Sequence, residues 1–333
     1  MRGAWLLGGG LVALAVLAGL PWAAAWRPAA REAAPVSCNA DTPQLLAGQA
    51  LKVMTWNIQF LSGRQPVPRP DRPAPADPVE LDATRLAQHL DRVATVIRAE
   101  APDILLLQEL HDGAAATDRQ DQLALLRARL ADLYPCSGEA FYRKAAFVPG
   151  EPAFGGVGLK LGILSRFQLA DGQRLQLPAA EAPFWRAPFA LRPALLSVRL
   201  PMRPGGSLTV ATTQLDTQDA AVARRQALML SEQIAGWRAE DRHWLLGGDL
   251  GLADGLRAPS SAGVQRIPDS QDVQDTGAEA WLTYGERTPD AIRDLLWLDG
   301  SLKRVEARVR HQGAETVSEH LPVIVRLLLP PPE

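Results

Sequence analysis

The chain has 333 residues, of which 47% are hydrophobic and 22% are charged, a composition typical of an ordinary globular protein. With a formal net charge of −2 and a sequence pI near 6.2, it is not a generally basic chain whose excess Lys and Arg would bind nucleic acid nonspecifically. Without its N-terminal leader the chain keeps about 300 residues, enough for one large domain.

An apolar leader opens the chain. Arg2 is followed by an uncharged run over residues 3–25, which ends in three alanines. These are the features of a cleavable signal peptide, but the run is also long enough, at roughly 18 residues or more, to span a bilayer uncut. We expect residues 1–25 to be a signal peptide or a membrane anchor, followed by a linker over residues 26–49. Either form exports the body to the periplasm or the cell exterior, and the anchor would associate it with the membrane.

The two cysteines, Cys38 and Cys136, belong to a chain expected to mature in an oxidising compartment, where a disulfide between them is chemically allowed. The alternative is a free or lipidated Cys38 with a buried Cys136. Spacing does not choose between these two states.

Helical and strand patterns are interleaved along the body. Apolar residues recur at helical spacing between Asp82 and Pro102, and again over about residues 121–133 and 219–237. Short apolar or alternating runs between them predict strands, while the proline- and aromatic-rich residues 170–190 predict a long loop. The order favours an α/β protein with mixed or antiparallel sheets.

Several predicted strands end in polar residues of the same chemical kind. Asn57 follows one apolar run, Glu109 ends a run of three leucines, and Asp249 follows two glycines at the end of another. Glu319 and His320 directly precede the last predicted strand. The glycines before Asp249 would let the backbone approach a neighbour or a ligand closely.

An amide, carboxylates and an imidazole, without a thiolate, suit a hard divalent ion such as Mg²⁺ or Mn²⁺. Such an ion neutralises phosphoryl oxygens and orients them for attack by water. A histidine held by a carboxylate can accept the proton of that water or stabilise developing charge. These strand ends are therefore capable of metal or phosphate chemistry.

The sequence between about residues 50 and 330 resembles the endonuclease/exonuclease/phosphatase superfamily, which has the deoxyribonuclease-I-like fold. The resemblance rests on six motifs that occur in the family's order: Thr55-Trp56-Asn57, Gln108-Glu109, Thr213-Gln214-Leu215-Asp216, Gly248-Asp249-Leu250-Gly251, Arg293-Asp294-Leu295 and Ser318-Glu319-His320-Leu321-Pro322. It implies a four-layer α/β sandwich, with two central mixed or antiparallel sheets packed face to face and helices outside.

Carried over to these positions, the resemblance makes Glu109 the principal ligand of a Mg²⁺ or Mn²⁺ ion, with Asn57 and Glu319 assisting. The reaction that it implies is hydrolysis of a phosphate ester, most simply of a phosphodiester.

The same resemblance makes His320 the catalytic histidine, oriented by Asp294. It gives Asp249 the role of aligning or activating the attacking water.

Three positions depart from the family pattern. Gly251 stands where many members have a phosphate-contacting asparagine, and Gln214 stands in place of a histidine. Gln214 can still donate a hydrogen bond to a phosphate oxygen, but it carries no charge. Glu319 replaces an aspartate and is one methylene longer, and a displacement of about an ångström can cost on the order of a hundredfold in rate. The alternative function is therefore a catalytically impaired member of the fold that acts as a binding or scaffold protein.

The fold does not select a substrate among lipid, nucleotide and nucleic-acid phosphoesters. Phe184, Trp185 and Phe189 form either a hydrophobic lip for an apolar partner or ordinary packing at the edge of the domain. We expect the protein to be a monomer.

Overall fold

The computed structural model describes residues 19, 22–67, 76–77, 79–145, 157–216, 218–240, 243–251 and 263–332. Most of the predicted leader, residues 1–18 and 20–21, therefore lies outside the described residues. Among the described residues, no helix combines the length and the apolar character needed to cross a membrane.

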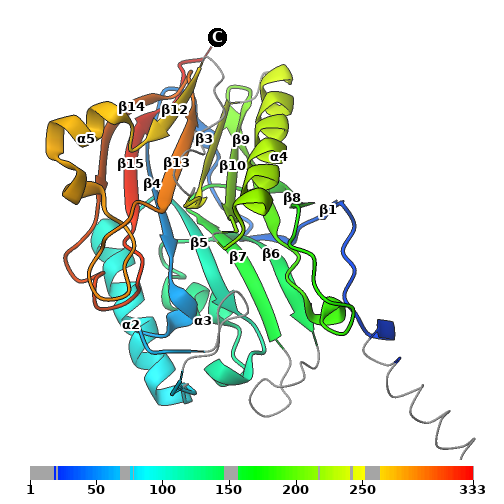
Figure 1. Ribbon diagram of the computed structural model, residues 1–333. Helices are drawn as coiled ribbons and strands as arrows, with labels where there is room; N and C mark the ends of the chain where they lie inside the picture. The colour runs from blue at the N-terminus through cyan, green and yellow to red at the C-terminus, as the bar shows by residue number, and fades with distance from the viewer. Residues whose placement is uncertain are drawn as a thin grey trace, which may run out of the picture.

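Two β-sheets form the centre of the molecule (Figure 1). The first has seven strands, in the spatial order β14 (Lys303–Val309), β15 (Val323–Leu328), β4 (Ala50–Asn57), β5 (Ile104–His111), β7 (Val157–Ser165), β6 (Cys136–Ala145) and β2 (Val36–Cys38). The second has eight, in the order β1 (Arg31–Ala33), β8 (Ala170–Gln176), β9 (Ala194–Arg203), β10 (Ser207–Gln214), β11 (His243–Asp249), β13 (Asp294–Asp299) and β12 (Val264–Ile267), with β3 (Leu45–Leu46) beside β9.

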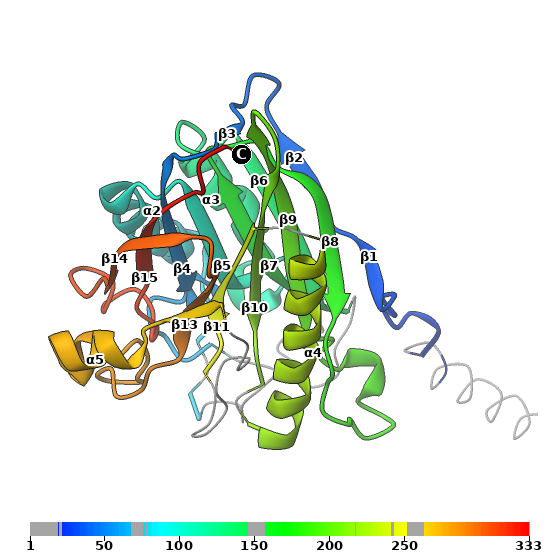
Figure 2. The same cartoon turned by 90° about the horizontal axis from the view of Figure 1, so that it is seen from above.

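Helices cover the outer faces of both sheets, as Figures 1 and 2 show. Helices α2 (Ala83–Glu100) and α3 (Gln122–Arg129) lie on the seven-stranded sheet, and α4 (Ala220–Ala239) lies on the eight-stranded sheet. The short helix α5 (Ser270–Thr276) lies near β12 and β14, and one-turn 3-10 helices occur at Gln59–Leu61, Ala115–Thr117, Ala187–Phe189 and Ala278–Trp281. The predicted four-layer α/β sandwich is confirmed.

Each sheet is mostly antiparallel but has a parallel pair at its centre. These pairs are β4 with β5, and β10 with β11. Asn57 lies opposite Gln108 in the first pair, and Gln214 lies opposite Asp249 in the second. Because the two sheets face each other, the carboxyl ends of four strands meet at one edge of the sandwich.

The two glycines before Asp249 allow the close packing at this edge. A Cβ atom on Gly247 would lie 2.8 Å from the Leu106 Cδ1 of the opposite sheet. A Cβ atom on Gly248 would lie 1.9 Å from the backbone oxygen of Thr213. The prediction that these glycines permit close backbone approach is confirmed.

The three predicted helices form, and each begins directly after an aspartate whose side chain accepts a hydrogen bond from the first turn. Asp82 caps α2, Asp121 caps α3 and Asp219 caps α4. This N-cap interaction satisfies backbone N–H groups that the helix itself leaves without partners.

The prediction of a loop over residues 170–190 is wrong for its first part, because residues 170–176 form β8. The sequence pattern does not indicate this strand because a charged residue, Arg174, occupies one of its buried positions. Its guanidinium donates to the backbone oxygens of Phe141 and Arg192, which compensates for its burial. Phe184 and Trp185, by contrast, are 72% and 71% exposed.

The segment expected to be a linker, residues 26–49, contains β1, β2 and β3, which pair with strands of the two sheets. A disulfide joins Cys38 of β2 to Cys136 of β6, and the two residues are direct partners in the ladder. The last described residues lie near β3 (Figure 2), where the backbone N–H of Gly48 donates to the Pro330 oxygen.

Candidate active site

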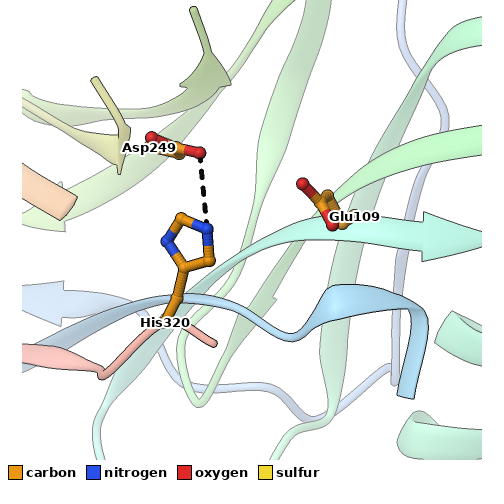
Figure 3. A group of neighbouring side chains, drawn as sticks. All are labelled: Glu109, Asp249 and His320. Atoms are coloured by element: carbon orange, nitrogen blue, oxygen red, sulfur yellow. Dashed lines mark ion pairs between the residues drawn. The ribbon is translucent and has the colours of Figure 1, made fainter. Parts of the chain in front are cut away.

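Three buried side chains converge at the edge where the parallel strand pairs end. Glu109, Asp249 and His320 each offer one ligand atom, and these atoms all lie within 4.8 Å of one another. Figure 3 shows that they point toward a common centre from three different parts of the chain. Because one residue comes from each sheet and the third from the loop before β15, only the folded sandwich assembles the group.

Glu109 owes its position to a β-bulge. The pairing of β5 with β7 shifts register between Leu107 and Leu110, and Glu109 has a φ of 54°. The expectation that the strand ends at Glu109 is therefore wrong, because β5 continues to His111. A bulge reorients a side chain without ending the strand, and here it contributes Glu109 to the site.

His320 is held by Asp294. The His320 Nδ1 lies 2.8 Å from the Asp294 Oδ2, so the ring donates to this carboxylate and its Nε2 faces Asp249 at 3.7 Å. Burial opposes protonation of the ring, but the charges of Asp294 and Asp249 outweigh it and raise the pKa of His320 to about 8. Without a metal, the imidazole is therefore mostly charged at neutral pH.

Asp249 is almost completely buried at the end of β11. Burial, reinforced by the nearby carboxylates of Asp294 and Glu109, raises its pKa to about 6. Its Oδ1 has no hydrogen-bond partner among the described residues. A buried carboxylate oxygen in this state is suited to bind a cation or a water molecule.

Asn57 lies beside Asp249 and accepts a hydrogen bond from the left-handed turn at residues 59–61. Its Nδ2 is 3.5 Å from the Asp249 Oδ2, and its Oδ1 accepts a hydrogen bond from the backbone N–H of Gln59. The Gln59 side chain in turn accepts from the backbone N–H of Glu319. In this arrangement Asn57 orients Asp249, and its role as a metal ligand stays a prediction.

Glu319 is half-buried next to His320 and is held through its backbone. Its carboxylate is not among the three groups that lie within 4.8 Å of one another in the described part of the chain. The predicted role of Glu319 as an assisting metal ligand is therefore supported by its position in the sequence only.

Gln214 contacts the site in a way that the sequence did not indicate. Its Nε2 donates to the Glu109 Oε1 at 2.8 Å. Its amide is thus directed at the carboxylate expected to bind the metal, and the predicted contact with a phosphate oxygen stays untested. The neighbouring Gln108 links the sheets, because its Nε2 donates to Thr55 and Thr212.

Two further residues flank the site without a role assigned from sequence. The Arg293 guanidinium lies 3.7 Å from the centre of the Tyr284 ring, and that ring lies 4.7 Å from the imidazole of His320. The charge of Arg293 favours the ionised form of Asp249. A Cβ atom on Gly251 would lie 2.8 Å from the Arg293 Cγ, so the stem of Arg293 fills the space beside Gly251. Arg293 belongs to one of the six family motifs, but its contacts depend on the fold and could not be seen in the sequence.

The donor set fits a hard divalent ion. Glu109 and Asp249 supply oxygens, and the described group contains no thiolate. The His320 Nε2 lies in the same group and would bind an ion only when the ring is neutral. The free Oδ1 of Asp249 adds an oxygen aimed at no protein donor among the described residues. These residues could therefore hold Mg²⁺ or Mn²⁺.

Comparison of the structure with solved ones identifies the same fold in several proteins. An endonuclease/exonuclease/phosphatase from Beutenbergia cavernae DSM 12333 is 24% identical, with a TM-score of 0.55 over 85% of this chain and 72% of that one. The human nocturnin catalytic domain with bound sulfate is 17% identical, with a TM-score of 0.56 over 88% and 97%. ANGEL2, described as a 2′,3′-cyclic phosphatase, is 14% identical, with a TM-score of 0.55 over 90% and 98%.

At these identities the structures establish the fold alone. A search of curated proteins gives no significant match. The model of the Endonuclease/Exonuclease/phosphatase family, however, matches residues 54–314, which is most of the chain and includes the site up to Asp294. With the sandwich and the strand-end residues in place, the chain belongs to the endonuclease/exonuclease/phosphatase family.

Proposed function

We propose that the protein is an exported phosphodiesterase that depends on Mg²⁺ or Mn²⁺. Members of its family are hydrolases that act on phosphoester bonds. The observation that carries the proposal is the convergence of Glu109, Asp249 and the His320–Asp294 pair at one edge of the sandwich. This set contains the groups that water-mediated cleavage of a phosphoester requires.

Glu109 is the principal metal ligand in this proposal, with Asn57 and Glu319 assisting. A bound divalent ion would neutralise the charge of the phosphoryl oxygens. Gln214 holds the Glu109 carboxylate by a hydrogen bond, which limits its rotation.

Asp249 and His320 have different roles in the reaction. Asp249, whose pKa is near 6, accepts the proton of the attacking water. The water oxygen bonds to phosphorus, the ester P–O bond breaks, and the leaving oxygen takes a proton from solvent. His320, held as a cation by Asp294, stabilises the negative charge that develops on the phosphate.

The direct test is hydrolysis of bis(p-nitrophenyl) phosphate by the full chain with Mg²⁺, with Mn²⁺ or with a chelator. We expect metal-dependent turnover that Glu109→Gln reduces by a factor of roughly 10²–10³ or more. The matched control is Glu306→Gln, because Glu306 is an exposed residue of β14 outside the site and loses the same charge. Turnover that persists with chelator and in Glu109→Gln would contradict the proposal.

A second candidate function is a binding or scaffold protein with impaired chemistry. The observation that favours it is the orientation of Gln214, whose amide is directed at Glu109, together with Gly251 in place of an amide side chain. Mn²⁺ titration followed by calorimetry distinguishes the two. A folded chain that neither binds Mn²⁺ nor hydrolyses the diester would support the scaffold function.

Export is supported by the apolar leader and by the Cys38–Cys136 disulfide, because such bonds persist mainly in oxidising compartments. Its test is the redox state of the pair in cells. Because buried Cys136 is inaccessible in the folded protein, alkylation is measured after denaturation without reductant. If the leader exports the chain, both cysteines should then resist alkylation in the full chain and should react when residues 2–25 are deleted. Reactive thiols in the full chain would exclude export. Membrane association, through an uncleaved leader, and the monomeric state remain predictions.

A further inference from the structure

A small pocket opens directly beside Glu109. It lies between the carboxyl edges of the two sheets and has a cavity volume of about 60 Å³. Its apolar walls come from both sheets and the adjoining loops, and consist of Phe60, Tyr142, Leu159, Leu191, Pro193 and Leu215. The volume is several times the roughly 10–15 Å³ that one water molecule needs, which leaves room for a group about the size of one ring.

The pocket walls are held in place before any ligand arrives. Phe60 is 1% exposed and stacks on the His111 ring, with the ring centres 4.1 Å apart. Gln122 donates to the backbone oxygen of Phe60 and accepts a hydrogen bond from the backbone N–H of His111. A preformed apolar site loses little free energy to ordering when it binds a ligand.

The charges around the pocket restrict its ligand. Glu109 and Asp216 are both among its lining residues, and none of the lining residues is Lys or Arg. A second phosphate placed there would face the Asp216 carboxylate without a Lys or Arg among the described lining residues, which is electrostatically unfavourable. The pocket therefore suits an uncharged group.

Besides Asp216 and Gln218, Gln214 lines the pocket with a polar side chain. Its Nε2 donates a hydrogen bond to Glu109. Its Oε1 is buried and has no hydrogen-bond partner among the described residues. An N–H or O–H group on the ligand would satisfy this oxygen.

We infer that this pocket binds one uncharged, ring-sized group of the substrate, attached directly to the phosphate that the Glu109 site takes. The inference rests on the proposed phosphoester function and narrows its substrate class. The substrate is a phosphoester with a compact aromatic or similarly apolar substituent on the Glu109 side. A chain of further phosphates or a long acyl chain does not fit in that position.

The test measures binding of two non-hydrolysable probes, methylphosphonate and phenylphosphonate, to the full chain with Mn²⁺ by calorimetry. We expect phenylphosphonate to bind at least about tenfold more tightly, because even one methylene in an apolar pocket is worth roughly 10–200-fold. Leu191→Trp fills the pocket from its half-buried wall and should reduce this ratio to near one. Leu191→Phe is the milder variant if the tryptophan prevents folding.

The matched control is Leu133→Trp, because Leu133 is also half-buried but packs on the core near the opposite end of β6. This variant should keep the wild-type ratio. Equal affinity for the two probes, no measurable binding of phenylphosphonate, or a ratio unchanged by both Leu191 variants would overturn the inference. Ring preference without hydrolysis of any diester would contradict the enzyme proposal alone, and hydrolysis without ring preference would contradict the pocket alone.

Discussion

The side chain of Arg293 fills the space that a side chain at position 251 would occupy beside the active site. Many members of the family carry an asparagine where this chain has Gly251, and here the stem of Arg293 occupies the position of the missing side chain. Its guanidinium then lies on the Tyr284 ring, close enough to Asp249 to favour its ionised form. The departure at Gly251 is therefore coupled to a cation that the site retains.

Adding the side chain back should consequently displace Arg293. We expect the single substitution Gly251→Asn to lower the free energy of unfolding. Arg293→Ala should lower it less in the Gly251→Asn background than in the wild type. Contacting residues typically show a coupling of about 0.5–3 kcal/mol. Urea unfolding of the wild type, both single variants and the double variant measures this coupling. Strictly additive free energies would show that the two side chains do not compete.

The pKa of His320 depends on one neighbour. Asp294→Asn keeps a hydrogen-bonding side chain but removes the charge that does most to raise the pKa of His320 above that of an ordinary histidine. Asp249 and Glu109 then oppose burial without Asp294, so the pKa of His320 should fall from about 8. NMR titration of the ring checks this, with the signal identified by its loss in His320→Gln.

The sign of the stability effect follows from the same shift. A histidine whose folded pKa is raised stabilises the fold fully below its ordinary pKa of about 6.5, and this contribution is lost as pH rises through about 8. Asp294→Asn should remove most of this pH dependence. An unchanged His320 titration in Asp294→Asn would show that Asp294 does not control the ring.

At the scale of single elements, the order of helices and strands follows from local sequence. The capping aspartates and the apolar spacing place α2, α3 and α4 to within a few residues of their ends. Strand β8 could not be recognised in this way, because Arg174 occupies a buried position whose partners lie in other segments. Its burial is decided by tertiary contacts.

The features of the site likewise fall into those that the sequence indicates and those that depend on tertiary contacts. The residue types at the strand ends were visible in the sequence, but the bulge that turns Glu109 and the left-handed turn at residues 59–61 were not. Gln59, Phe60 and Leu61 have φ values of 47°, 56° and 53°, which cost roughly 1–2 kcal/mol per residue for non-glycine residues. Hydrogen bonds to Asn57, Glu319 and Gln122 hold the turn in place, and all three depend on the folded sandwich.

Strand β11 should tolerate few changes at its two glycines. Gly247→Ala would press on side chains, whereas Gly248→Ala would meet the backbone oxygen of Thr213, which cannot rotate away. We expect Gly247→Ala to lower the free energy of unfolding by about 1–3 kcal/mol and Gly248→Ala to lower it more. Gly236→Ala is the control, because nothing lies within 4 Å of its added Cβ in α4. It should be stabilising by about 0.5–1 kcal/mol.

Urea unfolding of the three alanine variants ranks these effects. If Gly248→Ala proved as stable as the wild type, β10 and β11 could not approach each other as closely as the structure indicates. The geometry of the site would then be wrong as well, because the pairing of β10 with β11 places Gln214 opposite Asp249.

At the scale of the whole molecule, the strands near the N-terminus join residues 31–46 to both sheets. β1 is the edge strand of one sheet and β2 is the edge strand of the other. The Cys38–Cys136 disulfide fixes β2 to β6 at the register position where the two cysteines pair. The disulfide therefore holds the edge strand β2 against the seven-stranded sheet.

The disulfide should accordingly contribute much of the stability. It closes a loop with a sequence separation of 98 residues, and loops of this length predict a stabilisation of up to about 5 kcal/mol, with about 2–5 kcal/mol commonly lost on removal. We expect the Cys38→Ser/Cys136→Ser double variant to lose an amount in this range, measured by urea unfolding of the full chain. Reductant should lower the stability of the wild type to that of the double variant and leave the variant unchanged. Equal stability of oxidised wild type and double variant would mean that the pairing of β1 and β2 with the sheets holds this segment without the covalent bond.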